Sequence, residues 1–180
     1  AVDNTNRIYE LDSSNTLAYR GTMNTSLVTG DIAIAPNGML YGLGNSYTIA
    51  NPQIIQFDLS TNSTSVVGVF PFLAKSASLV CGNDNELYAL GDNFELWKYN
   101  LTTGMSTYLD NLGVNSPGDI TFYKGNIIFQ ETSENNIMAY NLKNGNLRTI
   151  LCKKNDNQIW GISNRFTDCG NEVIIAADMF

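Results

Sequence analysis

The sequence predicts an all-β protein in which one four-stranded unit recurs along the chain. Three observations predict it: short runs of alternating apolar and polar residues, turn-forming Gly, Asn and Pro residues between the runs, and similar phrases at a regular spacing. The phrase NELYALGDNFELWKYNLTTG, residues 85–104, contains two such runs and a turn, and residues 38–61 and 125–145 repeat its pattern. With 180 residues, of which 43% are hydrophobic, the chain is expected to fold as one domain.

Three sets of positions agree on a repeat of 40 to 47 residues. The residue that precedes an Asp or Asn at the end of a run recurs with steps of 46, 42 and 41 residues, at Leu11, Phe57, Tyr99 and Tyr140. A position in the run before it recurs with steps of 47, 40 and 46, at Tyr41, Tyr88, Ile128 and Ile174. A still earlier run gives steps of 46, 42 and 42, at Ile32, Ser78, Ile120 and Ile162. A β-sandwich with accidental similarity between its halves would not produce one period at three sets of positions.

The individual strands follow from the same pattern. The chain begins with two runs, RIYELD at 7–12 and TLAYRGTM at 16–23, and the next unit has four, at 30–36, 38–44, 53–60 and 63–70. Later units keep this order, and the chain ends with WGISNRF at 160–166 and EVIIAAD at 172–178. The expected turns contain residues that accept left-handed backbone angles, at Asn37-Gly38, Thr61-Asn62, Thr103-Gly104 and Asn144-Gly145.

Four antiparallel strands repeated at this spacing are typical of a β-propeller blade. The first two runs match the third and fourth strands of a unit, and the last two runs match the first and second. We therefore expect four blades of four antiparallel strands in a single domain, 1–180, with the two terminal segments completing one shared blade. The blades are expected at about 30–70, 71–113, 114–152, and 153–180 together with 1–29. The alternative is a fragment, or a chain that needs a second copy to make a larger ring.

Several phrases resemble the Asn-rich β-propeller repeats of secreted, surface-associated proteins from flavobacteria-like bacteria. They are GDITFYKGNIIFQ and NNIMAYNLKNGNLRTI, with GDIAIAPNGMLYGLG and VIIAADMF in the same style. The resemblance covers nearly the whole chain as a repeat pattern and contains no catalytic motif. It implies an exported propeller, located outside the cell or at its surface, usually without an assigned activity.

Composition excludes several kinds of function. A net charge of −7 disfavours nucleic acid and anionic lipid as partners, and no apolar run is long enough for a membrane helix. Cations, cationic surfaces and neutral sugars stay compatible. The absence of His removes the usual general base and the commonest zinc ligand. Cys81 is expected in the core, and whether Cys152 and Cys169 form a disulfide stays open.

Carboxylates are predicted to gather on one face of the propeller. Asp31 and Asp119 open first strands within a repeated Gly-Asp-Ile, whereas Asp92, Glu131 and Asp178 stand at or just beyond the ends of second strands. Both kinds of position lie on the same face of a blade. We hypothesise that Asp31 and Asp119 hold a hard cation such as Ca²⁺ at the channel mouth. In the alternative interpretation they cap turns by accepting hydrogen bonds from nearby backbone amides.

The face also carries Trp160, at the start of a first strand. Its ring, beside Asn and Asp, could hold a sugar, or it could pack between blades. The sequence therefore predicts a secreted, non-enzymatic binding module. Its expected ligand is a protein or a glycan, held by Trp160, Asp92, Glu131 and Asp178. The alternatives are a carboxylate- or Ca²⁺-dependent hydrolase or lactonase at the channel mouth, and a structural spacer with no pocket larger than a few waters. A monomer is expected rather than a dimer.

Overall fold

The structure is a computed structural model of the 180-residue chain. It describes residues 5, 7–11, 14, 16–22, 28–44, 51–71, 78–91, 93–113, 119–131, 136–151, 159–165 and 173–178. Side chains are described within these ranges except at 11, at 28–30 and from 149 onward. The regular elements of this part are all β-strands, and it contains no helix that could cross a membrane.

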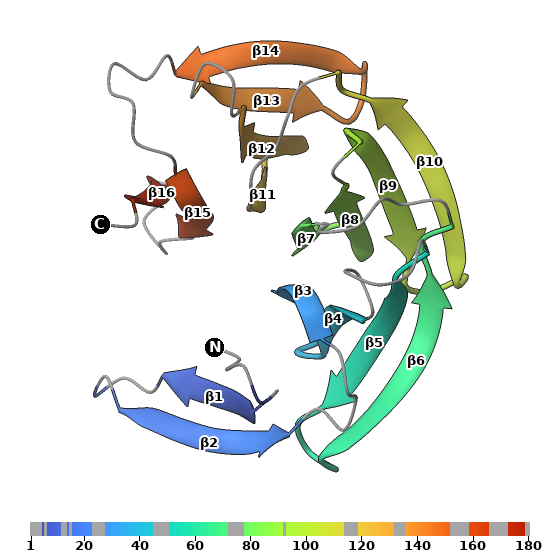
Figure 1. The fold of residues 1–180 in the computed structure, drawn as a ribbon, viewed down its shortest axis with the longest axis vertical. Coiled ribbons are helices and arrows are strands. Elements are labelled where there is room, and N and C mark those ends of the chain that lie inside the picture. The colour runs from blue at the N-terminus through green and yellow to red at the C-terminus, as the bar shows by residue number, and fades with distance from the viewer. Residues whose placement is uncertain are drawn as a thin grey trace.

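Three complete four-stranded antiparallel sheets make up most of the molecule (Figure 1). In each sheet the strands lie in chain order. The first blade contains β3 (Val28–Ile34), β4 (Leu40–Gly44), β5 (Gln53–Asp58) and β6 (Ser63–Val69). The second contains β7 (Ser78–Cys81), β8 (Glu86–Leu90), β9 (Glu95–Asn100) and β10 (Met105–Asn111). The third contains β11 (Ile120–Tyr123), β12 (Asn126–Gln130), β13 (Ile137–Asn141) and β14 (Asn146–Leu151).

Each end of the chain adds a two-stranded antiparallel sheet. These sheets contain β1 (Arg7–Leu11) with β2 (Leu17–Thr22), and β15 (Ile159–Arg165) with β16 (Val173–Asp178). Within the described residues they are two separate sheets. The strand order, the three whole blades and the two half-blades confirm the predicted β-propeller. Closure of the ring by pairing β16 with β1 stays a prediction.

The sheets are arranged around a common centre, with the first strand of each whole blade innermost (Figure 1). The strand β7 lies between β3 and β11, and β15 follows beside β11. The fourth strands, β6, β10 and β14, form the outer rim. All three sets of repeat positions fall where they were expected, on first, second and third strands. The repeat in the sequence is therefore the repeat of the blades.

The turn between the third and fourth strands explains one of these repeats. Asp58, Asn100 and Asn141 each end a third strand, and the Oδ1 of each accepts hydrogen bonds from backbone N–H groups two and three residues ahead. This is the local bonding that Asp and Asn offer to a turn. Three residues that close these turns have left-handed backbone angles: φ is 54° at Asn62, 69° at Gly104 and 67° at Gly145. The predicted hairpin turns are confirmed.

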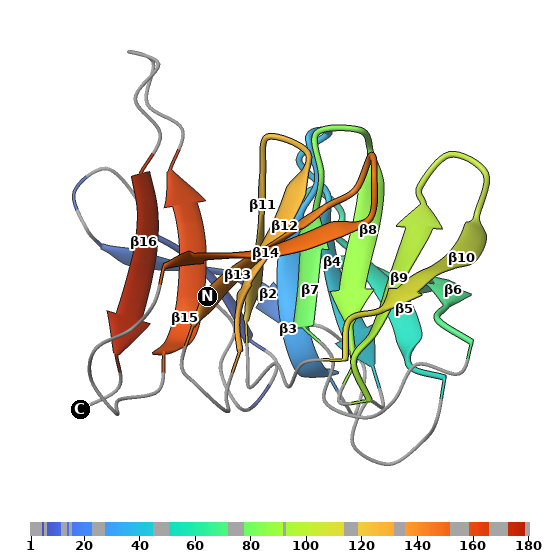
Figure 2. The same cartoon turned by 90° about the horizontal axis from the view of Figure 1, so that it is seen from above.

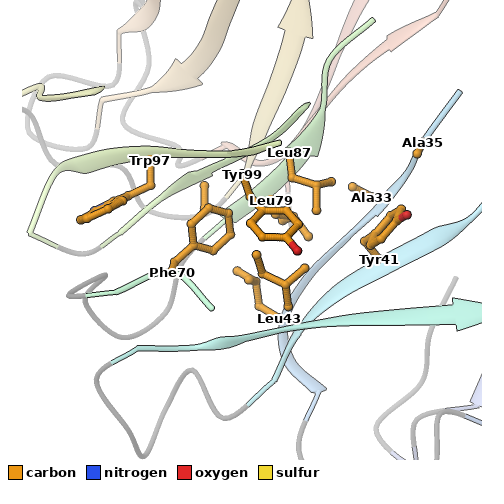
Figure 3. Packing of buried hydrophobic residues seen from close by; sticks show 11 residues of the cluster. Ala33, Ala35, Tyr41, Leu43, Phe70, Leu79, Leu87, Trp97 and Tyr99 are labelled. Carbon is orange, nitrogen blue, oxygen red and sulfur yellow. The ribbon is translucent and has the colours of Figure 1, made fainter. Parts of the chain in front are cut away.

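The core lies between neighbouring blades. Figure 3 shows the cluster between the first and second blades, in which Phe70, Leu79, Trp97 and Tyr99 pack together. Trp97 is buried, and its ring meets Tyr108 edge-on at a centroid distance of 5.4 Å. A second cluster joins the second and third blades. The recurring tyrosines Tyr41, Tyr88 and Tyr140 are buried, whereas Tyr9 is partly exposed.

Gly68 is needed for close packing beside the cluster between the first and second blades. A Cβ atom on Gly68 would lie 2.4 Å from Cε2 of Tyr99, closer than side-chain atoms approach one another. The missing side chain lets the Tyr99 hydroxyl donate a hydrogen bond to the carbonyl oxygen of Val67 at 2.5 Å. Gly68 therefore lets the third strand of the second blade dock against the fourth strand of the first.

Candidate binding site in the channel

A cavity of about 710 Å³ runs along the innermost strands of the three whole blades. Its walls come from residues 31–36 on β3 and the turn after it, 79–83 on β7 and the turn after it, and 119–122 at the start of β11. We call it the channel cavity. Its volume is within the range of small-molecule sites, roughly 300–1,000 Å³. A structural spacer was expected to contain no pocket beyond a few waters, so the channel cavity disfavours that alternative.

Two of the predicted carboxyl groups, those of Asp31 and Asp119, meet at one end of this cavity. A hydrogen bond joins their two side chains. The Oδ1 of Asp31 accepts a hydrogen bond from the N–H of Ile32 at 2.8 Å, and its Oδ2 accepts one from the N–H of Leu79 at 3.4 Å. Asp31 therefore links β3, β7 and β11. It does bond to backbone amides, as the capping interpretation expects, and it also faces a second acid.

The environment of this acid pair favours a shared proton. Burial is the main cause that raises the pKa of Asp31, from its usual 3.8 to about 8. The charge of Asp119 and the hydrogen bond to its side chain raise this pKa further, whereas the amides of Ile32 and Leu79 lower it. Two carboxyl groups can share a hydrogen bond only when one of them supplies a proton. With its pKa near 8, the Asp31 carboxyl is mostly protonated at neutral pH and can donate this hydrogen bond.

The register of the third blade places Glu131 at the same end as Asp119. Ile120 pairs with Phe129, so the residues before Ile120 and after Phe129 lie at one end of the sheet. Glu131 is 5% exposed, and its N–H donates a hydrogen bond to the Asn136 carbonyl oxygen at 2.8 Å. Its burial makes it a poor candidate for an open surface site. Its predicted ligand-binding role stays a prediction.

The other predicted site residues are placed only in part. Trp160 and Asp178 lie on β15 and β16, and Ile159 pairs with Asp178, so both residues lie at the same end of that sheet. In Figure 2, β15 begins and β16 ends at the lower side of the molecule. The side chains of Trp160 and Asp178, and all of Asp92, lie outside what the structure describes. Their predicted roles in ligand binding therefore stay predictions.

The apolar wall of the channel cavity was not predicted from the sequence. Ile34 on β3 is 70% exposed, the largest exposure among the large hydrophobic residues described. With Val80 on β7 and Phe122 on β11 it gives the cavity apolar surface beside the acid pair. A signal existed in the run GDIAIAP, where isoleucines alternate with alanines. Ala33 and Ala35 pack toward the second blade, which leaves Ile34 on the other side.

The chemistry available in the described part of the site is limited. No group of three or more Asp, Glu or Cys side chains is placed there to hold a metal ion. Calcium prefers six to eight oxygen ligands, so Asp31 and Asp119 would be only part of such a site. Their role as Ca²⁺ ligands stays a prediction. Cys81 also lines the cavity, but burial and then the nearby Asp84 raise the pKa of its thiol to about 11. Cys81 is thus a protonated wall residue at neutral pH rather than a nucleophile.

Comparison with known proteins identifies the fold and no family. No family model matches the chain, and no curated protein matches it. Among solved structures, a chain of the nidogen/laminin complex matches with a TM-score of 0.69 and 16% identity, over 87% of this chain and 59% of that one. An inactive variant of virginiamycin B lyase from Staphylococcus aureus, with quinupristin, matches with a TM-score of 0.65 and 13% identity, over 97% and 57%. TolB from Acinetobacter baumannii matches with a TM-score of 0.63 and 16% identity, over 96% and 46%.

These similar structures are β-propellers, which agrees with the observed blades. At identities of 13% to 16% the likeness shows the fold alone. The chain spans roughly half the length of the proteins that it matches, between 46% and 59% in these three.

Proposed function

We propose that this chain is a non-enzymatic binding module, secreted or held at the cell surface, with its ligand site in the channel cavity. The observation that carries the proposal is the cavity itself, with the Asp31–Asp119 pair at one end and both apolar and polar side chains along its walls. A concave, mostly apolar site with a few convergent polar groups is the usual form of a ligand site. The ligand is a protein side chain or a small molecule, with a glycan as the further candidate.

The similar structures support binding as a use of this fold. The nidogen/laminin structure is a complex of proteins, and the lyase variant is described with quinupristin, so a protein and a small molecule are both ligand classes worth testing. That lyase variant is catalytically inactive after replacement of one histidine by alanine. The present chain contains no histidine, so it cannot use that residue type for chemistry. A hydrolase or lactonase that uses Asp31 and Asp119 stays a hypothesis without support from the described geometry.

The proposal can be tested by mapping ligands on isotope-labelled protein. A panel of alkylammonium ions, carboxylates, alcohols and neutral oligosaccharides is added, and backbone amide shifts are followed by NMR. We expect saturable shifts of amides along β3, β7 and β11, such as those of Asp31, Val80 and Thr121. Shifts confined to the outer rim, or no saturable shift with any ligand of the panel, would contradict a site in the channel.

A matched pair of variants separates the channel from the rest of the surface. Ile34 is 70% exposed in the channel cavity, and Val66 is 54% exposed on the outer strand β6. The substitution Ile34→Trp fills the cavity with a large ring, whereas Val66→Trp adds the same ring at the rim. Ligand shifts should be lost in Ile34→Trp and kept in Val66→Trp. Equal behaviour of the two variants would exclude the channel as the site.

A further inference from the structure

We propose that the hairpin β1–β2 opens from the first blade as a unit, while the three whole blades stay folded. The inference concerns a different part of the molecule from the channel cavity and does not rest on the proposed function. It follows from how the hairpin is joined to the first blade, how the whole blades are joined to one another, and which contacts hold the hairpin itself together.

A small apolar cluster joins the hairpin to the first blade, which lies beside it (Figure 1). Among the described residues this cluster contains three buried side chains, those of Ile8, Leu40 and Phe57, with Ile32 packed against them. Of these three, one belongs to the hairpin, Ile8. In the same part of the chain, the clusters that join the first blade to the second and the second to the third contain eleven and ten buried residues. Because stabilisation grows with the apolar area removed from water, the hairpin is attached more weakly than the blades are to one another.

The whole blades are also joined by hydrogen bonds from tyrosine hydroxyl groups. Tyr99 in the second blade donates to a carbonyl oxygen of β6 at 2.5 Å, and Tyr140 in the third donates to a carboxylate oxygen of β10 at 3.0 Å. The residue at the same repeat position in the first blade is Phe57, which has no hydroxyl group. Its ring packs closely on Gly21 of the hairpin, together with the side chain of Asn62. The hairpin therefore docks by close packing at a position where the whole blades add a tyrosine hydrogen bond.

The hairpin also has contacts of its own that do not depend on the first blade. The side chains of Arg20 and Glu10 form an ion pair across the two strands, with 2.6 Å between Nη2 and Oε2. The rings of Tyr9 and Tyr19 meet edge-on at a centroid distance of 6.0 Å, and the hydroxyl groups of Tyr19 and Thr22 share a hydrogen bond at 2.8 Å. These contacts persist when the hairpin leaves the blade. A segment with few buried apolar contacts to its neighbours opens at a lower free energy than the whole molecule unfolds.

Opening of the hairpin changes the surface of the first blade. Leu40 and Phe57 are 3% and 0% exposed in the closed form, and they lie on β4 and β5, which stay in the blade. Removal of Ile8 and Gly21 brings these two side chains into contact with water. The hairpin therefore determines whether this apolar face of the first blade is covered or exposed.

Native-state hydrogen exchange of the intact chain at low urea concentrations tests the inference, because it measures the free energy of opening at each amide. The amides of β1 and β2 should be at least tenfold less protected than the most protected amides of β8 and β9. Their protection should also depend less on urea, since opening of a hairpin exposes less surface than global unfolding. Equal protection of the two sets, or an equal urea dependence, would overturn the inference.

A matched pair of core substitutions separates the two kinds of opening. Leu87, which is 0% exposed in the second blade, stabilises both the closed form and the form in which only the hairpin has opened. Leu87→Ala should therefore lower the protection of the β8 and β9 amides at least tenfold and leave that of the β1 and β2 amides unchanged. Ile8 stabilises the closed form alone, so Ile8→Ala should lower the protection of the β1 and β2 amides at least tenfold.

Two results from these variants would refute the inference. If Leu87→Ala lowers the protection of β1 and β2 as much as that of β8 and β9, the hairpin opens only when the whole molecule unfolds. If Ile8→Ala leaves the protection of β1 and β2 unchanged, the small cluster does not hold the hairpin closed. Leu87→Val removes less volume and replaces Leu87→Ala if that variant does not fold, with the same pattern expected over a smaller range.

Discussion

The shared proton of the acid pair predicts an unusual dependence of stability on pH. Folding holds the pKa of Asp31 near 8, whereas in the unfolded chain it has its ordinary value of 3.8. Between these two values the folded protein binds a proton that the unfolded chain does not bind. Stability therefore falls as pH rises through this window. The contribution is fully present below about pH 4 and is lost above about pH 8.

The magnitude follows from the size of the shift. A difference of one pKa unit corresponds to about 1.4 kcal/mol, so a window of about four units amounts to no more than about 6 kcal/mol. This is a large part of the stability of a small domain, which is typically about 5–15 kcal/mol. Asp31→Asn removes the titration but keeps a side-chain oxygen for the N–H of Ile32 and an amide donor for Asp119. The variant should gain stability relative to the parent as pH rises, by up to about 1.4 kcal/mol per pH unit.

The assay is urea unfolding of the parent and of Asp31→Asn at intervals from pH 4 to pH 9. The difference between their free energies of unfolding should grow steadily up to about pH 8 and then level off. Asp58→Asn is the control, because hydrogen bonds from Ser60, by its side chain and its backbone, lower the pKa of the exposed Asp58 carboxyl. Its own effect has the opposite sign and lies below pH 4. Two parallel curves for the parent and Asp31→Asn between pH 5 and pH 8 would refute the shared proton.

Two further substitutions test the fold. Asn100→Ala removes an acceptor of two backbone hydrogen bonds, at 2.9 and 2.8 Å, and should lower the free energy of unfolding in urea by about 2 kcal/mol. The control Asp58→Asn should cost under about 0.5 kcal/mol, because asparagine performs the same role at the equivalent position. Equal costs for the two variants would contradict this role in the turn. Gly68→Ala places a Cβ atom 2.4 Å from the Tyr99 ring and should cost about 1–3 kcal/mol. Adding Tyr99→Leu should give a double variant that is more stable than the sum of the two costs predicts, and strict additivity would show that the two residues do not collide.

Much of the fold could be predicted because its signals are local. Alternation within a strand, and the Asp or Asn that closes a third strand, depend on a few neighbouring residues and recur in each blade. The side chains of Asp58, Asn100 and Asn141 make the turns that the repeat predicted. Closure of the ring depends on contacts between residues far apart in the chain. The sequence pattern predicts which strands the two ends supply and does not determine how they meet.

The candidate site was predicted only in part for the same reason. The repeated Gly-Asp-Ile indicated that Asp31 and Asp119 occupy equivalent positions in different blades, and the structure brings these two side chains together. The spacing places them two repeats apart, but it does not predict that their side chains meet. Nor could the bond from the Leu79 N–H, which depends on how β7 lies between β3 and β11. The apolar wall at Ile34 is likewise a product of packing, because exposure of one isoleucine depends on what its neighbours leave uncovered.

The positions at which the four repeats differ determine which side chains the site contains. At the position before the first-strand anchors, the four units carry Asp31, Ala77, Asp119 and Gly161. Only the first and third units have an acid, and the second supplies the Leu79 N–H to Asp31 instead. A third carboxylate at this position would add a like charge beside a pair that already shares one proton, at a cost that grows as the site is buried. Two acids and a backbone donor therefore meet at one end of the channel cavity. The blades repeat what the fold requires, and the positions where they differ determine what the channel can bind.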